Sequence, residues 1–287
     1  MAITAQMVKE LRDKTSAGMM DCKKALTEAN GDMEKAMEAL RQKGIASAEK
    51  KMGRIAAEGL VASVIDGNKG AMVEVNCETD FVAKNDDFKA LTQNLAKAVL
   101  NENPADVDAF LASTCKECGK TIQDVIKEKI ASIGEKITFR RFAYAEGNVS
   151  TYIHNGKIGV LLVTDKKDEE LSKDICLHIA SCAPEYLAST DIPESVREEE
   201  KRIEMGKEDL LKKPENIREK IVEGRLHKIL AQKCLLEQAF VKDPNQTIAQ
   251  LIEGKLNIVK FDRYVLGEGL EKRQENFAEE VAAQMKG

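Results

Sequence analysis

Missing from this sequence are the features that mark membrane proteins, secreted proteins and general nucleic-acid binders. No stretch approaches the roughly 18 consecutive apolar residues of a membrane span, and residues 1–15 lack the apolar run and cleavage site of a signal peptide. Lys and Arg number 44 against 49 Asp and Glu, so the positive excess expected of a nucleic-acid binder is absent. We therefore expect a soluble, cytoplasmic protein with no direct contact with nucleic acid or membrane.

Residues and motifs that carry catalysis are also scarce. The chain has 3 histidines and no P-loop, nucleophile elbow or metal motif, so we expect no catalytic residue, cofactor, metal or small-molecule substrate. Its 7 cysteines are an odd number spread along 287 residues, which favours reduced thiols over a disulfide framework. Cys115 and Cys118 form a lone C-x-x-C pair with no second pair at zinc spacing, and we interpret them as structural or incidental thiols.

What the chain does contain is enough apolar material for real cores, at 43% hydrophobic residues alongside 32% charged ones. Residues 1–55 predict a compact domain of three short amphipathic helices. The first two helices are separated at residues 16–18 and the last two at Asn30-Gly31-Asp32, where Asp32 can cap the third helix. Met19 and Met20 are adjacent and cannot share a helix face, so we expect one to pack and the other to be exposed.

The middle of the chain contains an internal repeat with an offset of 88 residues. Each copy has two alternating runs around a Gly/Asn turn, at residues 66–68 and 154–156, followed by an amphipathic helix, which predicts a hairpin and a helix in each copy. The aligned positions are Gly59, Val61, Ser63, Ile65, Lys69, Val73 and Val75 with Gly147, Val149, Thr151, Ile153, Lys157, Leu161 and Val163.

The two copies differ in the loop between hairpin and helix. Twelve residues separate Val75 from Phe88, whereas seven separate Val163 from Leu171, so the first copy has five extra residues within 76–85. Extra loop length on a duplicated scaffold is often where function resides. The loop includes Phe81, which the residues alone favour as an anchor folded back onto the core, since single apolar residues in loops are common. Asp80 can cap a helix that begins at Phe81.

The remaining segments are helical and densely charged. Residues 194–232 predict a projecting antiparallel helical hairpin, with Pro214 at the first helical position of its second arm. A last amphipathic helix is expected from about Leu270 to Met285. We predict an α+β fold with domains at 1–55, 56–145, 146–262 including the hairpin, and a C-terminal helical module at 263–287.

Two long segments carry a family resemblance. Residues 11–26 (LRDKTSAGMMDCKKAL) and 74–84 (EVNCETDFVAK) resemble the two signature regions of the bacterial translation elongation factor Ts family, in that family's order and at its distance from the N-terminus. The shorter segments 153–161, 222–225 and 267–272 are also similar to it. The resemblance therefore covers essentially the whole chain.

This resemblance implies a guanine-nucleotide exchange factor that is not an enzyme and that promotes GDP release from elongation factor Tu by disturbing its magnesium and phosphate site. It implies that the N-terminal domain is like a ubiquitin-associated module, and that this domain and the C-terminal module touch the G domain of Tu. Phe81 is expected to enter an apolar slot near the magnesium site, and His154 to meet the distal domain. The partner-binding residues that it implies are Arg12, Met19, Met20, Lys23, Thr79, Asp80, Phe81, Val82 and His154.

Two other functions remain open at this point. A non-enzymatic adaptor that acts through its ubiquitin-associated-like domain would be identified by a pull-down that lacks elongation factor Tu. A thiol redox protein that uses Cys115 and Cys118 would lose activity when both are changed to Ser.

Overall fold

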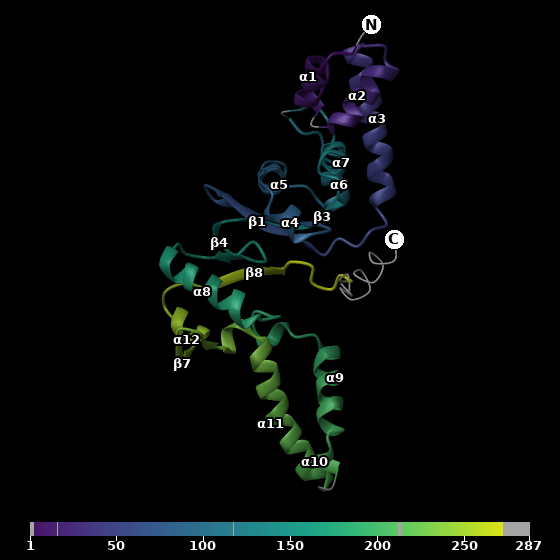
Figure 1. The fold of residues 1–287 in the computed structure, drawn as a ribbon. Helices are drawn as coiled ribbons and strands as arrows, with labels where there is room; N and C mark the ends of the chain where they lie inside the picture. Colours follow the sequence, from purple (N-terminus) through teal and green to yellow (C-terminus); the bar gives the residue numbers. More distant parts are fainter. Residues whose placement is uncertain (1–2, 16, 117, 212–213, 272–287) are drawn as a thin grey trace. The chain divides into compact units, whose positions relative to one another are not determined.

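The computed structural model describes residues 3–15, 17–116, 118–211 and 214–271, which form an α+β protein (Figure 1). The predicted fold class is therefore confirmed. The chain divides into two compact units, each described here by itself. The first comprises residues 1–62, 73–142 and 265–287, and the second comprises residues 63–72 and 143–264. Much of the predicted C-terminal helix lies outside the described residues.

Three helices open the first unit: α1 (Ala5–Thr15), α2 (Met19–Glu28) and α3 (Met33–Lys51). They have a small core of their own. The predicted break before α3 is present, because Gly31 adopts a φ of 86° and the Asp32 carboxylate accepts hydrogen bonds from the N–H groups of Glu34 and Lys35. The core residues are Leu11, Cys22, Ala25, Leu26 and Ala36.

The first sheet has the strand order β1 (Glu58–Asp66), β2 (Lys69–Cys77) and β3 (Ile137–Glu146). Its central strand β2 is buried at every position after Lys69, as expected for a strand with neighbours on both sides. The helices between β2 and β3 are α4 (Asp80–Lys84), α5 (Asp86–Glu102), α6 (Val107–Ala112) and α7 (Ile122–Ile133). The predicted buried face of α5 is confirmed at Phe88, Leu91, Leu95 and Val99.

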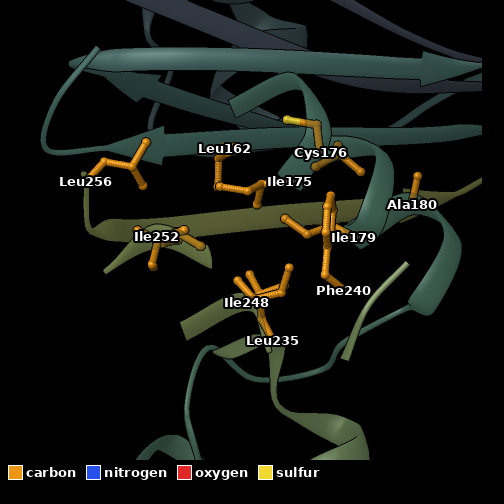
Figure 2. Packing of buried hydrophobic residues seen from close by; sticks show 12 residues of the cluster. Leu162, Ile175, Cys176, Ile179, Ala180, Leu235, Phe240, Ile248, Ile252 and Leu256 are labelled. Carbon is orange, nitrogen blue, oxygen red and sulfur yellow. The ribbon is translucent and has the colours of Figure 1, made fainter. Parts of the chain in front are cut away.

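The second sheet has the order β4 (Asn148–His154), β5 (Ile158–Thr164) and β8 (Ile258–Val265). Antiparallel pairing of β4 with β5 confirms the hairpin predicted at residues 154–156. Helix α8 (Glu169–Cys182) packs on both strands and contributes Ile175 and Ile179 to a core that Figure 2 shows from close by. Ser63 and Thr151 are equivalent positions of the two repeat copies, 88 residues apart, and the Ser63 hydroxyl donates to Thr151 Oγ1 at 3.1 Å. The two copies therefore contact each other directly.

The predicted helical hairpin consists of α9 (Glu194–Met205), a short α10 (Glu208–Leu211) and α11 (Glu215–Lys233), and α9 packs against α11. Pro214 was predicted at the first helical position, but it lies at the N-cap of α11, one residue before the first helical residue Glu215. Ion pairs from Arg225 to Asp209 and Glu204 cross between the arms. The remaining short elements are Ser189–Asp191, Leu235–Glu237, β6 (Ala239–Phe240), β7 (Asp243–Thr247) and α12 (Ile248–Ile252).

Candidate functional site

The extra loop of the first repeat copy forms the short helix α4. Phe81 on this helix is 80% exposed, the largest exposed fraction among the large hydrophobic side chains of the described residues. Its neighbour Val82 is half-buried and Ala83 is buried, so one side of α4 packs while the other presents the aromatic ring to solvent. The reading of Phe81 as an anchor folded back onto the core is therefore wrong.

The helix α4 is capped by Thr79 and not by Asp80. The Thr79 hydroxyl oxygen accepts a hydrogen bond from the N–H of Val82 at 3.3 Å, and the helix begins at Asp80. The thiol of Cys77 donates to the Thr79 carbonyl oxygen at 3.1 Å. Burial, helped by the charge of Glu135, raises the pKa of Cys77 to about 12, so this thiol keeps its proton at neutral pH and remains a donor.

A carboxylate from a distant segment fixes the start of α4. Glu135 accepts hydrogen bonds from both the Thr79 N–H, at 3.0 Å, and the Thr79 hydroxyl, at 2.7 Å. The preceding residue Glu78 is held in the same way, because its Oε1 accepts from the Lys136 N–H at 2.6 Å and from Arg54 Nη1 at 3.2 Å. Glu135 and Lys136, which fix the base of the Phe81 helix, therefore lie more than 50 positions away from it in the sequence.

Sequence reasoning missed this clamp. Glu135 and Lys136 lie outside the family-like segments, and the residue that could have marked their position is Gly134, which ends α7 with a φ of 91°. A helix end followed by a charged residue predicts a turn, but it does not predict which other segment the turn meets. Glu78 is within a family-like segment, yet its acceptor role became visible only from its partners.

Charged neighbours surround the Phe81 ring. Lys84 Nζ lies 2.6 Å from Asp80 Oδ2 and 5.9 Å from the centroid of the Phe81 ring, which is within cation–π range. The pair is solvent-exposed, with 46% of the Asp80 side chain and 73% of the Lys84 side chain accessible. Exposed pairs of this kind are worth about 0–1 kcal/mol, so a binding partner can displace Lys84 from Asp80 at little cost.

The four predicted contact residues of the N-terminal helices are all exposed: Arg12 on α1, and Met19, Met20 and Lys23 on α2. The expectation that one methionine packs is wrong, since Met19 is 58% and Met20 75% exposed. Both belong to the first turn of α2, immediately after Gly18, and the buried face of the helix begins only at Cys22. Two adjacent flexible thioethers on a surface form an adaptable apolar contact.

His154 lies in the second unit, at the end of β4, with its side chain exposed. The Asn155 amide nitrogen is 3.3 Å from Nε2, and the Tyr152 hydroxyl is 3.1 Å from Nδ1. If the amide donates to Nε2, the neutral imidazole carries its proton on Nδ1 and donates to the Tyr152 oxygen. Both ring nitrogens therefore have partners on the same hairpin, which holds the ring in one orientation.

Behind the site, the fully buried carboxylate of Glu74 joins three segments of the first unit. It accepts from Arg140 Nη1 at 2.9 Å, from Arg141 Nε at 2.6 Å and from the Gly267 N–H at 2.8 Å. Burial is the largest influence and raises the pKa of Glu74, but the hydrogen bonds from Gly267, Arg140 and Arg141 together bring the pKa below its usual value. This acid is thus kept ionised as a structural link between β2, β3 and the segment after β8.

These geometries describe a recognition surface. An exposed aromatic ring next to an acid on a fixed helix provides contact area and one charge, with none of the nucleophile and base pairs of covalent catalysis. Within residues 3–15, 17–116, 118–211 and 214–271 no cluster of three or more His, Cys, Asp or Glu could hold a metal ion. In the same part of the chain, every helix is too short or too polar to cross a membrane.

Comparisons with known proteins show what this chain is similar to. A family model described as "Elongation factor TS" matches residues 78–268, a range that includes α4 and its cap Thr79. Over 293 aligned residues the chain is 46% identical to the curated "Elongation factor Ts" of Alkalilimnicola ehrlichii, and the alignment covers 100% of both chains.

Proposed function

This chain belongs to the elongation factor Ts family, and on that premise we propose that its α4 helix is the wedge by which it releases GDP from elongation factor Tu. Family membership makes it a nucleotide exchange factor of translation elongation that acts on elongation factor Tu. It binds and releases a partner and catalyses no chemical reaction of its own. The proposal concerns which residues do this and how.

The single observation that carries the proposal is the 80% exposure of Phe81 on a helix that is itself fixed. An aromatic side chain supplies a large contact area at low conformational cost, which is why aromatic residues dominate binding hot spots. The Glu135 clamp on Thr79 positions α4 before the partner arrives, so little ordering entropy is lost on binding. We therefore assign Phe81 to the apolar slot near the magnesium site of the G domain.

The proposed mechanism needs no catalytic group. GDP is held in a G domain by backbone N–H groups, a lysine and Mg²⁺, whose combined affinity depends on close geometry. Insertion of Phe81 and Val82 separates these elements, and the binding energy of the two proteins offsets the lost nucleotide contacts. Asp80 brings a negative charge toward an anionic ligand once the exposed Lys84 has been displaced from it.

Other exposed residues complete the proposed interface. Arg12, Met19, Met20 and Lys23 contact the same G domain through the N-terminal helices, while His154 contacts the distal domain of Tu from the second unit. The C-terminal module of residues 263–287 is a further proposed G-domain contact. Support for the N-terminal assignment comes from the exposure of both methionines, which have no packing role to account for them.

The finer architecture is part of the proposal as well. We propose that residues 1–55 form a ubiquitin-associated-like domain, supported by the separate core of α1 to α3. We also propose core halves at 56–145 and 146–262, and action in the cytoplasm without direct nucleic-acid or membrane contact.

The decisive experiment measures release of a fluorescent GDP analogue from purified elongation factor Tu with and without this protein. Release should accelerate strongly in its presence. Linkage supplies a second condition, because a protein that weakens GDP binding must itself be bound more weakly when GDP is present, by the same factor. If its affinity for Tu is independent of GDP and Mg²⁺, the wedge mechanism is wrong.

A further inference from the structure

The connection between α6 and α7 is a tight turn that carries the C-x-x-C pair. The N–H of Cys115 donates to the Lys120 carbonyl at 2.8 Å, and the N–H of Gly119 donates to the Cys115 carbonyl at 2.9 Å. Thr114 and Thr121 form an antiparallel bridge at its base, and Gly119 has a φ of 65°. The chain therefore reverses within a few residues, which brings positions i and i+3 to within about 7 Å at their Cα atoms.

The two thiols of this turn interact and are accessible. The Cys115 side chain interacts with that of Cys118 and is the largest influence on the pKa of Cys118, which it raises. Cys118 is exposed and Cys115 half-buried, whereas Cys22, Cys77, Cys176 and Cys234 are buried and Cys182 is half-buried. A disulfide joins Cα atoms about 4.4–6.8 Å apart, a separation that a chain reversal of this length can provide.

We propose that Cys115 and Cys118 are a reversible thiol–disulfide site that forms an intramolecular disulfide by exchange with a small-molecule disulfide of the glutathione class. The described residues offer the pair no third His, Cys, Asp or Glu with which to hold a metal ion, which favours exchange over metal binding. Neither cysteine is among the residues proposed to bind elongation factor Tu, so failure of this proposal would leave the proposed exchange function untouched.

The chemistry balances without any further reagent. The Cys118 thiolate attacks one sulfur of glutathione disulfide, a new sulfur–sulfur bond forms, and one glutathione leaves as its thiolate. The Cys115 thiolate then attacks the Cys118 sulfur of the mixed disulfide and expels the second glutathione thiolate. Two electrons pass from the cysteines to glutathione, and the two protons released by the cysteines end on the two glutathione thiols.

The surroundings of the turn set the rate of the first step. The hydrogen bond to Cys115, followed by burial, raises the pKa of Cys118, while the backbone N–H and the charge of Lys120 oppose this and only partly offset it. The charge of Lys120 is itself paired with Glu128, at 2.6 Å. Because the thiolate is the nucleophile, exchange should be slow at pH 7 and accelerate as the pH rises to 9.

The test equilibrates the full-length reduced protein in glutathione buffers of graded ratio, blocks remaining thiols with iodoacetamide, and locates the modified cysteines by peptide mass spectrometry. We expect Cys115 and Cys118 to escape alkylation together, linked to each other, in a single transition that depends on the square of the reduced glutathione concentration. Dithiothreitol should restore both thiols. The buried cysteines should not form disulfides with glutathione.

Two variants make the result decisive, and melting curves confirm that each is folded. Cys182→Ser removes a half-buried thiol elsewhere and should leave the transition unchanged. Cys118→Ser should abolish it and leave at most a glutathione adduct on Cys115. The proposal is overturned if wild-type protein gives only independent glutathione adducts, if no linked peptide forms at any ratio, or if Cys118→Ser retains the paired transition.

Discussion

Replacing Phe81 by Ala separates a binding role from a folding role. A phenylalanine buries roughly 200 Å² when fully covered. Because Phe81 is 80% exposed, only about 40 Å² of it is covered in the unbound chain, which corresponds to about 1 kcal/mol at roughly 25 cal/mol per Å². Loss of the contact with Lys84 adds at most about 0.5–1 kcal/mol. The total is at most about 2 kcal/mol, so Phe81→Ala should lower the melting temperature by only a few degrees.

Binding should respond much more strongly. The exposed part of Phe81 is the area available to a partner, and truncation of a buried aromatic hot spot costs about 2–4 kcal/mol. At about 1.4 kcal/mol per factor of ten, the affinity for nucleotide-free elongation factor Tu should fall about 30- to 700-fold. Release of fluorescent GDP should slow accordingly at limiting concentrations of this protein.

Phe88→Ala is the matched control, since Phe88 is the same residue type on the next helix and is fully buried. It should cost about 3–5 kcal/mol of folding stability. The reasoning is refuted if Phe81→Ala destabilises the chain as much as Phe88→Ala does, or if Phe81→Ala exchanges GDP at the wild-type rate.

Three further substitutions test the supporting structure. Glu135→Gln loses one of the two hydrogen bonds to Thr79, so it should lower the free energy of unfolding by about 1 kcal/mol in denaturant titrations. GDP release should also be slower. GDP release at the wild-type rate would show that the clamp does not position Phe81. Glu74→Gln removes the buried negative charge that pairs with Arg140 and Arg141, and should lower the free energy of unfolding by about 3–5 kcal/mol. The folded pKa of Glu74 lies below its ordinary value of 4.5. The stability gap to wild type should therefore be full above that pH and shrink as the pH falls through the folded pKa, and a pH-independent gap would contradict this sign. His154→Ala should weaken the complex by about 0.5–1.5 kcal/mol in calorimetry with little change in melting; unchanged affinity would make His154 a turn residue only.

Local pattern was enough to predict the elements that carry the site. Alternation of residue type around Gly and Asn gives the two hairpins, and helical spacing gives α5 and α8, because these signals depend on neighbours a few residues apart. The repeat comparison located the extra loop, and the family resemblance singled out Phe81 within it. Residue types at these positions therefore determined which segments exist and where the functional loop interrupts them.

Only the tertiary structure decided how that loop is held and which of its residues is presented. Thr79 meets Glu135 at a separation of 56 residues, and Glu74 meets Gly267 at a separation of 193. The spacing of residues in the sequence does not reveal such contacts. A glutamate is the same residue in the sequence whether its carboxylate is solvated or accepts a hydrogen bond from a distant N–H. The capping of α4 by Thr79 was settled in the same way, since either Thr or Asp can supply the acceptor and the backbone geometry of the whole fold chooses between them.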